Sequence, residues 1–253
     1  MSLENKVVVI TGGGSGLGAD AARAAHAAGA KILLNGRTQS KLAAVASHID
    51  PSGKDVALVA GDIGDPAVGA RVIKTARQRF GGVDVLYNNA GVFGIKPFQE
   101  VTRADLIEYF NLMSGYFTTT QFAVVEMMKR GGGSVVNVGS IWAMQGVGIT
   151  PAAVPSMAKG GIHALTRALA IELAGHNIRV NAIAPAVVET PLLESLASSG
   201  QIAAFNGFHP LGRNGQPRDI TSAFLFLADE AASGWITGVT LPVDGGVTAG
   251  TTH

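Results

Sequence analysis

Residues 11–18, TGGGSGLG, have the composition and spacing of a turn that binds a diphosphate. They follow an apolar run, KVVVIT, and precede an alanine-rich segment, so we expect them to join a strand to a helix. In such a turn glycine lets the backbone approach the diphosphate, and the helix N-terminus offers free N–H groups and a positive dipole end. The turn therefore predicts a dinucleotide site formed by Gly12, Ser15, Gly16, Leu17 and Gly18.

The end of the second apolar run favours NADP over NAD. NAD sites place an Asp or Glu there to bind the ribose 2′-hydroxyl, whereas a 2′-phosphate needs the acid absent and a guanidinium present. The run ends in NGR, so Arg37 is expected to bind the 2′-phosphate, although Ser15 adds no second positive charge in the glycine turn. A solvated charge at the strand end is the alternative for Arg37. After the third run, the candidates for adenine contact are Asp62 and Ile63.

The chain around the glycine turn alternates short apolar runs with longer alanine-rich or amphipathic segments, which indicates repeated strand–helix–strand units. Runs that are apolar almost throughout are typical of parallel strands covered on both faces. The sequence therefore predicts an α/β fold, a doubly wound parallel sheet of about seven strands in a single Rossmann-like domain over residues 1–253. This context makes the glycine turn more specific than tight-turn glycines alone. The expected strands are KVVVIT, KILLNG, DVALVA, VDVLYN, SVVNVG, NIRVNAIA and GVTLPVDGG, and the expected helices are 16–29, 39–48, 66–80, 102–130, 155–174 and 217–230.

The composition excludes several classes of partner and site. The 253 residues carry a formal net charge of +1 and are 15% charged, so neither a nucleic-acid surface nor a polybasic membrane patch is expected. There is no cysteine, which excludes disulfides and zinc–thiolate sites, and we predict no metal site. The apolar runs fall short of the roughly 20 residues that span a bilayer. We expect a cytoplasmic protein with a small-molecule partner.

Residues 190–217, which we term the lid segment, have the weakest periodicity in the chain. They carry Gly, Ser and Asn and include Phe205, Phe208 and His209. Long segments without their own regular periodicity often cover a binding site. The lid segment is therefore a candidate cover over the substrate, with an ordinary surface excursion as the alternative.

Motifs along the whole chain resemble those of the classical short-chain dehydrogenases/reductases. Besides the glycine turn they are NNAG at 88–91, GS at 139–140, AKGG around Lys159, NAIAPAVVETPL at 181–192 and VDGG near the end. The resemblance implies a Rossmann-like fold, NAD(P) binding and a homotetramer or homodimer. It further implies cofactor contacts from Asn89, Ala90, Gly91, Lys159, Pro185, Val188 and Thr190, with Ala186 where the family usually has glycine.

The family uses a Ser, a Tyr, a Lys and an Asn to support hydride transfer between nicotinamide and a carbonyl or alcohol. By resemblance, Ser140 holds the substrate oxygen, and Lys159 binds the nicotinamide ribose. A neighbouring ammonium also lowers the pKa of the tyrosine, which donates or accepts the substrate proton. The tyrosine and lysine of the family are four residues apart, which places both on one helix face.

The position four residues before Lys159 holds Pro155 instead of tyrosine. Proline has no ionisable proton and cannot act as the acid. It is tolerated at the first position of a helix, and it pushes the preceding residue out of the α region. We therefore expect Val154 to lie outside the helix and Pro155 to begin it, with Lys159 still presented to the site.

The asparagine position also departs from the family pattern. The usual spacing places asparagine three residues before a glycine, but Asn111 precedes Gly115 by four, and the residue three before is Leu112. Either the spacing after Asn111 has changed by one residue, or the active position is now apolar, as Leu112 or Met113; alternatively, Asn111 still reaches the site through a shifted register. The family's asparagine lies at a local irregularity of its helix, and such irregularities often mark functional sites. A regular helix here would remove the proton relay.

We favour no residue as a replacement for the missing tyrosine. Ser156 lies about 100° around the helix from Pro155. Tyr109 and Tyr116 are expected in the core or at a subunit interface, and His163 is expected to pack. His209 in the lid segment is the most interesting candidate, because a lid can bring a side chain over the nicotinamide. An apolar pocket or the core would be built from Phe93, Trp142, Met144, Phe205 and Phe208, and the loop 145–150 is expected to reshape the site.

Three functions are compatible with these residues. The first is an NADP-dependent oxidoreductase acting on a carbonyl, alcohol or imine, with the usual acid absent or replaced, for example by a water held by Ser140 and Lys159. The second is an NADP-binding pseudoenzyme that holds a ligand without turnover. The third is non-redox chemistry in the same pocket. Binding of NADP is expected ahead of ordinary carbonyl reduction.

Overall fold

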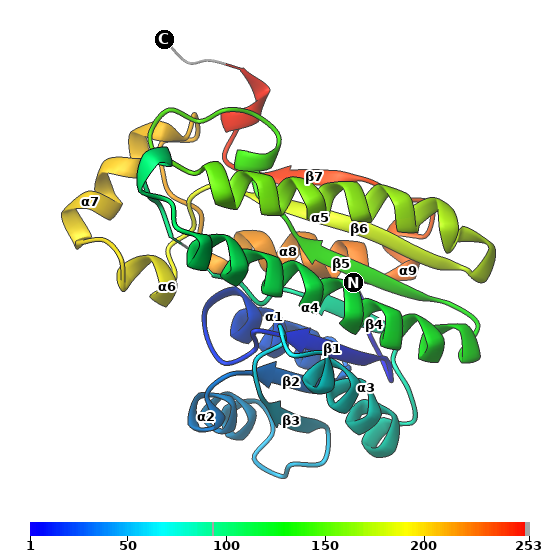
Figure 1. Cartoon of the computed structure of the whole chain (residues 1–253). Helices are drawn as coiled ribbons and strands as arrows, with labels where there is room; N and C mark the ends of the chain where they lie inside the picture. The colour runs from blue at the N-terminus through cyan, green and yellow to red at the C-terminus, as the bar shows by residue number, and fades with distance from the viewer. Residues whose placement is uncertain (93, 251–253) are drawn as a thin grey trace.

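The computed structural model describes residues 1–92 and 94–250, and its centre is a parallel sheet of seven strands in the order β3-β2-β1-β4-β5-β6-β7 (Figure 1). All neighbouring strands pair in parallel. The predicted doubly wound α/β fold is therefore confirmed. The strands are β1 (Val7–Thr11), β2 (Lys31–Gly36), β3 (Val56–Ala60), β4 (Val85–Asn88), β5 (Gly133–Val138), β6 (Ile178–Pro185) and β7 (Thr240–Val243).

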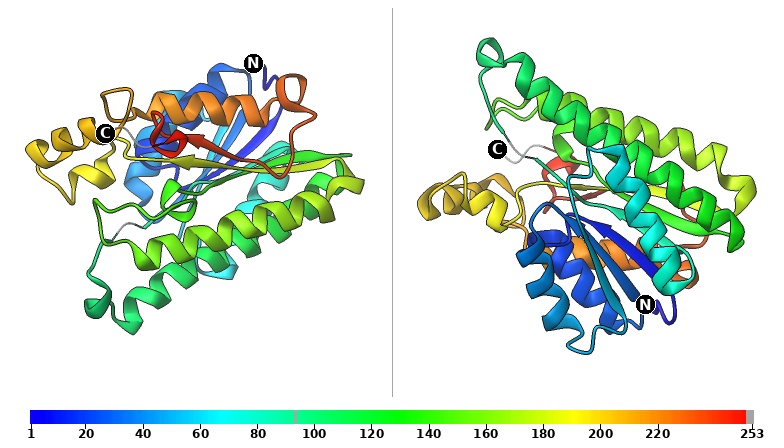
Figure 2. Two further views of the ribbon diagram at one scale, coloured as in Figure 1. Left: turned by 90° about the horizontal axis from the view of Figure 1, so that it is seen from above. Right: turned by 60° about the horizontal axis from the view of Figure 1, so that its bottom comes forward.

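Helices cover both faces of the sheet. Viewed along the sheet, α3, α4 and α5 lie on one side and α1 and α8 on the other (Figure 2). None of the helices in the described part of the chain is long and apolar enough to cross a membrane. The helices are α1 (Gly16–Ala27), α2 (Gln39–Ile49), α3 (Pro66–Phe80), α4 (Arg103–Lys129), α5 (Ala153–Glu172), α6 (Pro191–Glu194), α7 (Ser199–Ala204), α8 (Pro217–Ala228) and α9 (Glu230–Ser233).

The strands are apolar on both faces because each face packs on its own helical layer. In β1, Val7 and Val9 belong to the core beneath α3 and α4, whereas Val8 and Ile10 belong to the core beneath α1 and α8. Alternate side chains of a strand point to opposite faces, so continuous burial requires two covered faces. This is the pattern that the uninterrupted apolar runs predicted.

The sheet is built outward from β1 in both directions, with β2 and β3 on one side and β4 to β7 on the other, so the strand order reverses at β1. In open parallel sheets ligands bind beyond the carboxyl ends of the strands at such a point. The strand arrowheads in Figure 1 point toward the side where α6 and α7 of the lid segment lie. The topology thus brings the glycine turn after β1, the NNAG motif after β4 and the lid segment to one edge.

The start of α5 differs from the expected one. The helix begins at Ala153, so Val154 is helical and Pro155 is the third residue, not the first. The first four N–H groups of a helix have no partner within it, so proline costs no hydrogen bond at this position. Val154 is buried against Tyr109 and Ala158, and this packing accounts for a helical residue directly before proline.

Candidate cofactor cleft and active site

The glycine turn is packed so closely that side chains are excluded from it. A Cβ on Gly18 would overlap the carbonyl oxygen of Gly12, and Gly16 has a φ of +53°, in the left-handed region. Ser15 precedes α1 without a side-chain hydrogen bond to the helix. The N–H groups at the start of α1 are therefore available to an anion, which is what a dinucleotide diphosphate requires.

Side chains from the NNAG motif hold this turn in place. The Asn89 Nδ2 donates to the carbonyl oxygens of Thr11 and Gly12, at 3.0 and 3.3 Å. The Thr11 hydroxyl in turn accepts from the backbone N–H groups of Asn89 and Ala90, both at 3.0 Å. The turn after β1 is thus fixed to the end of β4 by four hydrogen bonds.

A cavity of about 700 Å³ runs along the carboxyl edge of the sheet from the glycine turn. A volume of this order suits a dinucleotide-sized ligand. Eleven of the residues expected at the cofactor line it: Gly12, Ser15, Gly16, Leu17, Arg37, Asp62, Ile63, Asn89, Ala90, Gly91 and Thr190. The cavity lining does not include Gly18, Ser140, Lys159, Pro185 and Val188. The cavity therefore brings together the residues expected at the adenine, ribose and diphosphate of the cofactor.

The end of β2 presents positive charge and no carboxylate. Arg37 lines the cavity beside Thr38, whose side chain makes no hydrogen bond to α2, and beside Lys41 in the first turn of that helix. Both basic side chains are exposed, and neither forms an ion pair within residues 1–92 and 94–250. Asn35 is occupied elsewhere, because its Nδ2 donates to Val59 and Gly61. Lys41 is a functional candidate that the sequence prediction missed.

Ser140 lies directly after β5 and begins a short 3-10 turn. Its hydroxyl accepts from the N–H of Trp142 at 3.3 Å, and its own N–H donates to Nε2 of His163 at 3.3 Å. His163 is buried on α5, one turn beyond Lys159. Nothing in the sequence indicates the contact between His163 and Ser140, beyond the helical spacing of His163 from Lys159.

Lys159 points from α5 toward the same end of β5. Its Nζ donates to the carbonyl oxygen of Val138 at 2.6 Å and lies 5.3 Å from the centre of the Tyr116 ring. Burial lowers the pKa of Lys159 to about 8. No carboxylate in the described part of the chain lies within ion-pair distance of this ammonium, so only dipoles and the aromatic ring stabilise its charge.

Pro155 lines a separate small cavity of about 40 Å³ together with Asp105 and Tyr109. The Tyr109 hydroxyl is engaged with the backbone of Gly94, and burial raises the pKa of this tyrosine. Hydrogen bonds from Lys96 and from the start of α4 lower the pKa of Asp105 to about 2. Near neutral pH, therefore, Asp105 has no proton to give and Tyr109 holds its own tightly.

The fourth helix, α4, is a regular α-helix throughout its length. Leu112 is buried in the core with Tyr116, whereas Asn111 is exposed at the wall of the cofactor cavity, beside Gly64. Met113 is half-buried and packs against the same core. The helix thus exposes Asn111 at the cavity wall and buries Leu112, whose apolar side chain also lines the cavity.

The remaining candidates for a replacement acid are engaged or buried. The Tyr116 hydroxyl donates to the carbonyl oxygen of Ala90 at 2.9 Å, and burial raises its pKa well above the usual value. His209 is 3% exposed and its Nδ1 bonds to the carbonyl oxygen of Phe205. Ser156 is half-buried on the first turn of α5. The interpretation of Tyr109 and Tyr116 as core residues is confirmed by their burial.

Aromatic side chains from two loops meet beyond Ser140. The rings of Trp142 and Phe208 lie 6.1 Å apart, and Trp142 Nε1 donates to the Thr150 hydroxyl. Met144 is exposed, and Phe205 is half-buried in the lid segment. Phe93 lies outside the described residues. The loop that contains Thr150 is therefore fixed to the aromatic side chains near the expected substrate position.

The end of β6 carries the remaining expected contacts. Pro185 is its last, buried residue, and Val188 forms a bridge with Gly215. Thr190 precedes and caps α6 and lies against the glycine turn, with its Cβ 3.5 Å from the position of a Cβ on Gly16. Ala186 is not in the left-handed region, so alanine can replace the family glycine without backbone strain.

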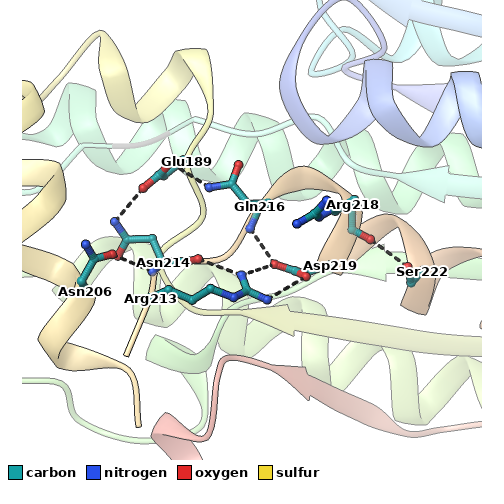
Figure 3. A network of polar contacts seen from close by, with 8 residues as sticks. All are labelled: Glu189, Asn206, Arg213, Asn214, Gln216, Arg218, Asp219 and Ser222. Carbon is teal, nitrogen blue, oxygen red and sulfur yellow. Dashed lines mark hydrogen bonds and ion pairs between the residues drawn. The ribbon is translucent and has the colours of Figure 1, made fainter. Parts of the chain in front are cut away.

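A polar network closes the base of the lid segment (Figure 3). Glu189 accepts from Asn214 at 3.1 Å and from Gln216 at 2.7 Å, and these hydrogen bonds lower its pKa. Arg213 forms an ion pair with Asp219 at the start of α8. The two ends of the lid segment are thus held together, although nothing in the sequence pattern identified Glu189.

Comparison with known proteins agrees with this geometry. The sequence profile described as enoyl-(acyl carrier protein) reductase matches residues 12–248. A solved short-chain type dehydrogenase/reductase from Mycobacterium marinum superposes with a TM-score of 0.92 at 29% identity, with 98% of each chain covered. This chain belongs to the short-chain dehydrogenase/reductase family.

Other relatives show the range of the short-chain dehydrogenase/reductase family. The 3-oxoacyl-[acyl-carrier-protein] reductase FabG of Thermotoga maritima is 33% identical, over 98% of this chain and 99% of its own. The L-rhamnose-1-dehydrogenase of Scheffersomyces stipitis is 35% identical, over 97% of this chain and 96% of its own. Membership implies an oxidoreductase scaffold with an NAD(P) cofactor and a small-molecule substrate, but these relatives act on unlike substrates.

Proposed function

We propose that the protein is an NADP(H)-binding oxidoreductase for a carbonyl, alcohol or imine, in which the tyrosine acid of the family is replaced by Pro155. The observation that carries the cofactor preference is the end of β2, where Arg37 and Lys41 line the cavity and the strand ends in NGR, without a carboxylate. A 2′-phosphate is bound well by a guanidinium and an ammonium together, and α2 adds the positive end of its dipole.

The residues expected to bind the cofactor match the pattern of the family, whereas the residues expected to transfer the proton depart from it. Ser140 follows β5, and Lys159 reaches from α5 to the carbonyl oxygen of Val138 at the end of β5, consistent with roles in holding the substrate oxygen and the nicotinamide ribose. When bound, NADPH would supply the hydride. The chain itself offers no tyrosine hydroxyl four residues before Lys159, so we infer that reduction is slow or is limited to substrates that need little help from an acid, such as activated carbonyls and iminium ions.

The test compares cofactor binding with turnover. Fluorescence titration should give tighter binding of NADPH than of NADH, and the difference should disappear in Arg37→Ala/Lys41→Ala. Each charge-assisted contact is worth about 1.5–3 kcal/mol, so each single variant should lose at least about tenfold in NADPH affinity. Equal affinities for the two cofactors in the unaltered protein would refute the NADP preference.

An NADP-binding pseudoenzyme, or a non-redox enzyme using the same pocket, is the second candidate function. It is favoured by two observations: α4 buries Leu112, and Lys159 donates its hydrogen bond to the backbone carbonyl of Val138. The two functions are separated by following NADPH absorbance with a panel of ketones, aldehydes and cyclic imines. Tight NADPH binding with no oxidation above the background rate for the whole panel would support the second function over the first.

We further propose that residues 190–217 form a lid over the substrate. The segment begins at the cofactor cavity, with Thr190, Pro191 and Leu192 in the wall, and its base is closed by Glu189. Ligand binding should therefore protect α6 and α7 from hydrogen exchange. An exchange pattern in this segment that NADPH and substrate leave unchanged would favour an ordinary surface excursion.

A homodimer or homotetramer is proposed from the outer face of α4. This face carries exposed apolar side chains at helical spacing, Ile107, Phe110, Phe117, Val125 and Met128. Large exposed apolar patches on soluble proteins commonly mark association surfaces. Sedimentation should show an oligomer that Phe110→Asp/Phe117→Asp converts to a smaller species, and a monomer in the unaltered protein would refute the assignment.

A further inference from the structure

Two side chains of α5 contact the polar backbone groups on either side of Gly139. Lys159 donates to the carbonyl oxygen of Val138 at 2.6 Å, and His163, one turn later, accepts from the N–H of Ser140 at 3.3 Å. Side chains four residues apart share one helix face, so both can reach the same stretch of backbone. The turn that carries the Ser140 hydroxyl is therefore attached to α5 at two points.

The packing of His163 against Gly139 leaves no room for a side chain at this position. A Cβ at this position would overlap Nε2 of His163 and lie 2.6 Å from its Cδ2. The backbone of Gly139 is outside the left-handed region, so its conformation alone does not demand glycine. The imidazole of His163 therefore explains why position 139 holds glycine, and we expect the two residues to be sterically coupled.

The electrostatic surroundings keep His163 able to accept. Burial, followed by the charges of Lys159 and Arg167, lowers its pKa to about 4. Both charged groups lie on α5, and the group facing the imidazole from the turn after β5 is the N–H of Ser140. A neutral imidazole whose Nε2 accepts must carry its proton on Nδ1, whereas an imidazolium cannot accept at all.

We propose that His163 is a positioning residue for Ser140. Its Nε2 accepts a hydrogen bond from the Ser140 N–H and thereby fixes the turn after β5. The role rests on the proposed function, in which the Ser140 hydroxyl holds the substrate oxygen. His163 does not contact the substrate; it sets where the hydroxyl stands and occupies the Ser140 N–H. Substituting His163 should therefore alter the substrate step and leave cofactor affinity nearly unchanged.

The test compares His163→Leu, which removes the acceptor, with His163→Gln, whose amide oxygen can accept in the same place. In the apo protein, hydrogen exchange of residues 139–144 should accelerate at least tenfold in His163→Leu and stay near the original rate in His163→Gln. Nitrogen NMR of the unaltered protein should show His163 as the Nδ1–H tautomer near neutral pH. An unchanged exchange rate in His163→Leu, or a proton on Nε2, would overturn the proposal.

A second pair of variants tests the steric match. Gly139→Ala should lower thermal stability clearly, and adding His163→Ala should recover most of the loss because the small side chain frees the space. Full tolerance of Gly139→Ala in the presence of His163 would contradict the packing argument. Both arms use the apo chain, so their results stand whether or not the protein turns over any substrate.

The kinetic arm applies wherever turnover is measurable, in the unaltered protein or in Pro155→Tyr. His163→Leu should lower kcat about tenfold with the KM for NADPH within twofold, and His163→Gln should restore most of kcat. A parallel rise in the KM for NADPH would indicate a general loss of structure and would overturn the positioning role. If neither background turns over, the proposed oxidoreductase function fails, while the exchange and NMR arms still decide the position of His163.

Discussion

Replacing Pro155 by tyrosine should reveal how much of the active site is intact. Pro155 is the third residue of α5, where the N–H regained on substitution has no partner within the helix, so the backbone cost is small. The new phenol would stand four residues before Lys159, on the same helix face. A positioned acid contributes about 10²–10⁴-fold to rate, so Pro155→Tyr should raise kcat for ketone reduction within that range.

The pH dependence sharpens this prediction. The pKa of Lys159 is about 8, so its ammonium predominates at pH 7 and would lower the pKa of the new phenol. The assay is NADPH absorbance with an unactivated ketone, measured from pH 6 to pH 10. Pro155→Phe is the matched control, because it supplies the ring without the hydroxyl. Equal rates for Pro155→Tyr and Pro155→Phe would refute the argument that a missing proton donor limits the reaction.

The altered asparagine position predicts a limit to that gain. Leu112 is buried in the core, so Leu112→Asn loses apolar burial and adds a buried amide, at a cost of about 2–5 kcal/mol. If the relay also matters, Pro155→Tyr/Leu112→Asn should be less stable than Pro155→Tyr but faster. A double variant that folds and shows no further gain in kcat would mean that the relay is not limiting.

Three further outcomes follow from the charges of the site. Arg37→Ala should weaken NADP binding by about 10- to 100-fold while leaving NAD binding within twofold, as measured by fluorescence titration. Lys159→Met should raise the melting temperature, because it removes a buried charge that has no carboxylate partner. The same substitution should weaken binding of the nicotinamide cofactor. An unchanged melting temperature would show that Val138 and Tyr116 compensate the charge fully. His163 has a pKa of about 4 in the folded chain against 6.5 in the unfolded chain. The free energy of unfolding should therefore be fully maintained above pH 6.5 and fall by about 3 kcal/mol as the pH drops to 4. Urea unfolding should show a smaller loss of stability at acid pH in His163→Gln.

The fold was predictable because its signals are local and repeated. Six strand–helix alternations with apolar runs predicted the parallel sheet, and the bounds of α3 match the expected 66–80. Here Asp65 accepts from the N–H of Ala67, Pro66 follows at the first helical position, and Gly81 ends the helix with a φ of +89°. Each of these residues acts within its own turn, so the sequence alone contains the boundary.

The start of α5 was wrong because the deciding interaction is not local. Proline disfavours the α conformation of the residue before it, which placed Val154 outside the helix in the prediction. In the structure Val154 is 7% exposed and packs with Tyr109 of α4. Full burial of a valine is worth about 1.5–3 kcal/mol, enough to outweigh a local conformational preference.

The site shows the same division between local and distant information. The glycine turn and the basic end of β2 lie in contiguous stretches, and the sequence placed most of their residues at the cavity. Lys41 was missed because the prediction stopped at the strand end, although the first turn of the next helix faces the same space. His163 and Glu189 could not be found, since their partners Ser140 and Gln216 are more than twenty residues away and come close only in the folded chain.

The two departures from the family pattern act on the same part of the chemistry. In the proposed function, Pro155 stands where the family has its proton donor, and a regular α4 buries Leu112 where a relay side chain would be needed. Pro155 does not line the cavity that Arg37 and Lys41 line, whereas Leu112 contributes an apolar side chain to its wall. Lys159 then has the carbonyl oxygen of Val138 as its hydrogen-bond acceptor. We therefore expect cofactor binding and proton transfer to be separable in this chain. A loss of NADP affinity in Pro155→Tyr would contradict that separation, whereas unchanged affinity with faster turnover would place the whole defect at the proton.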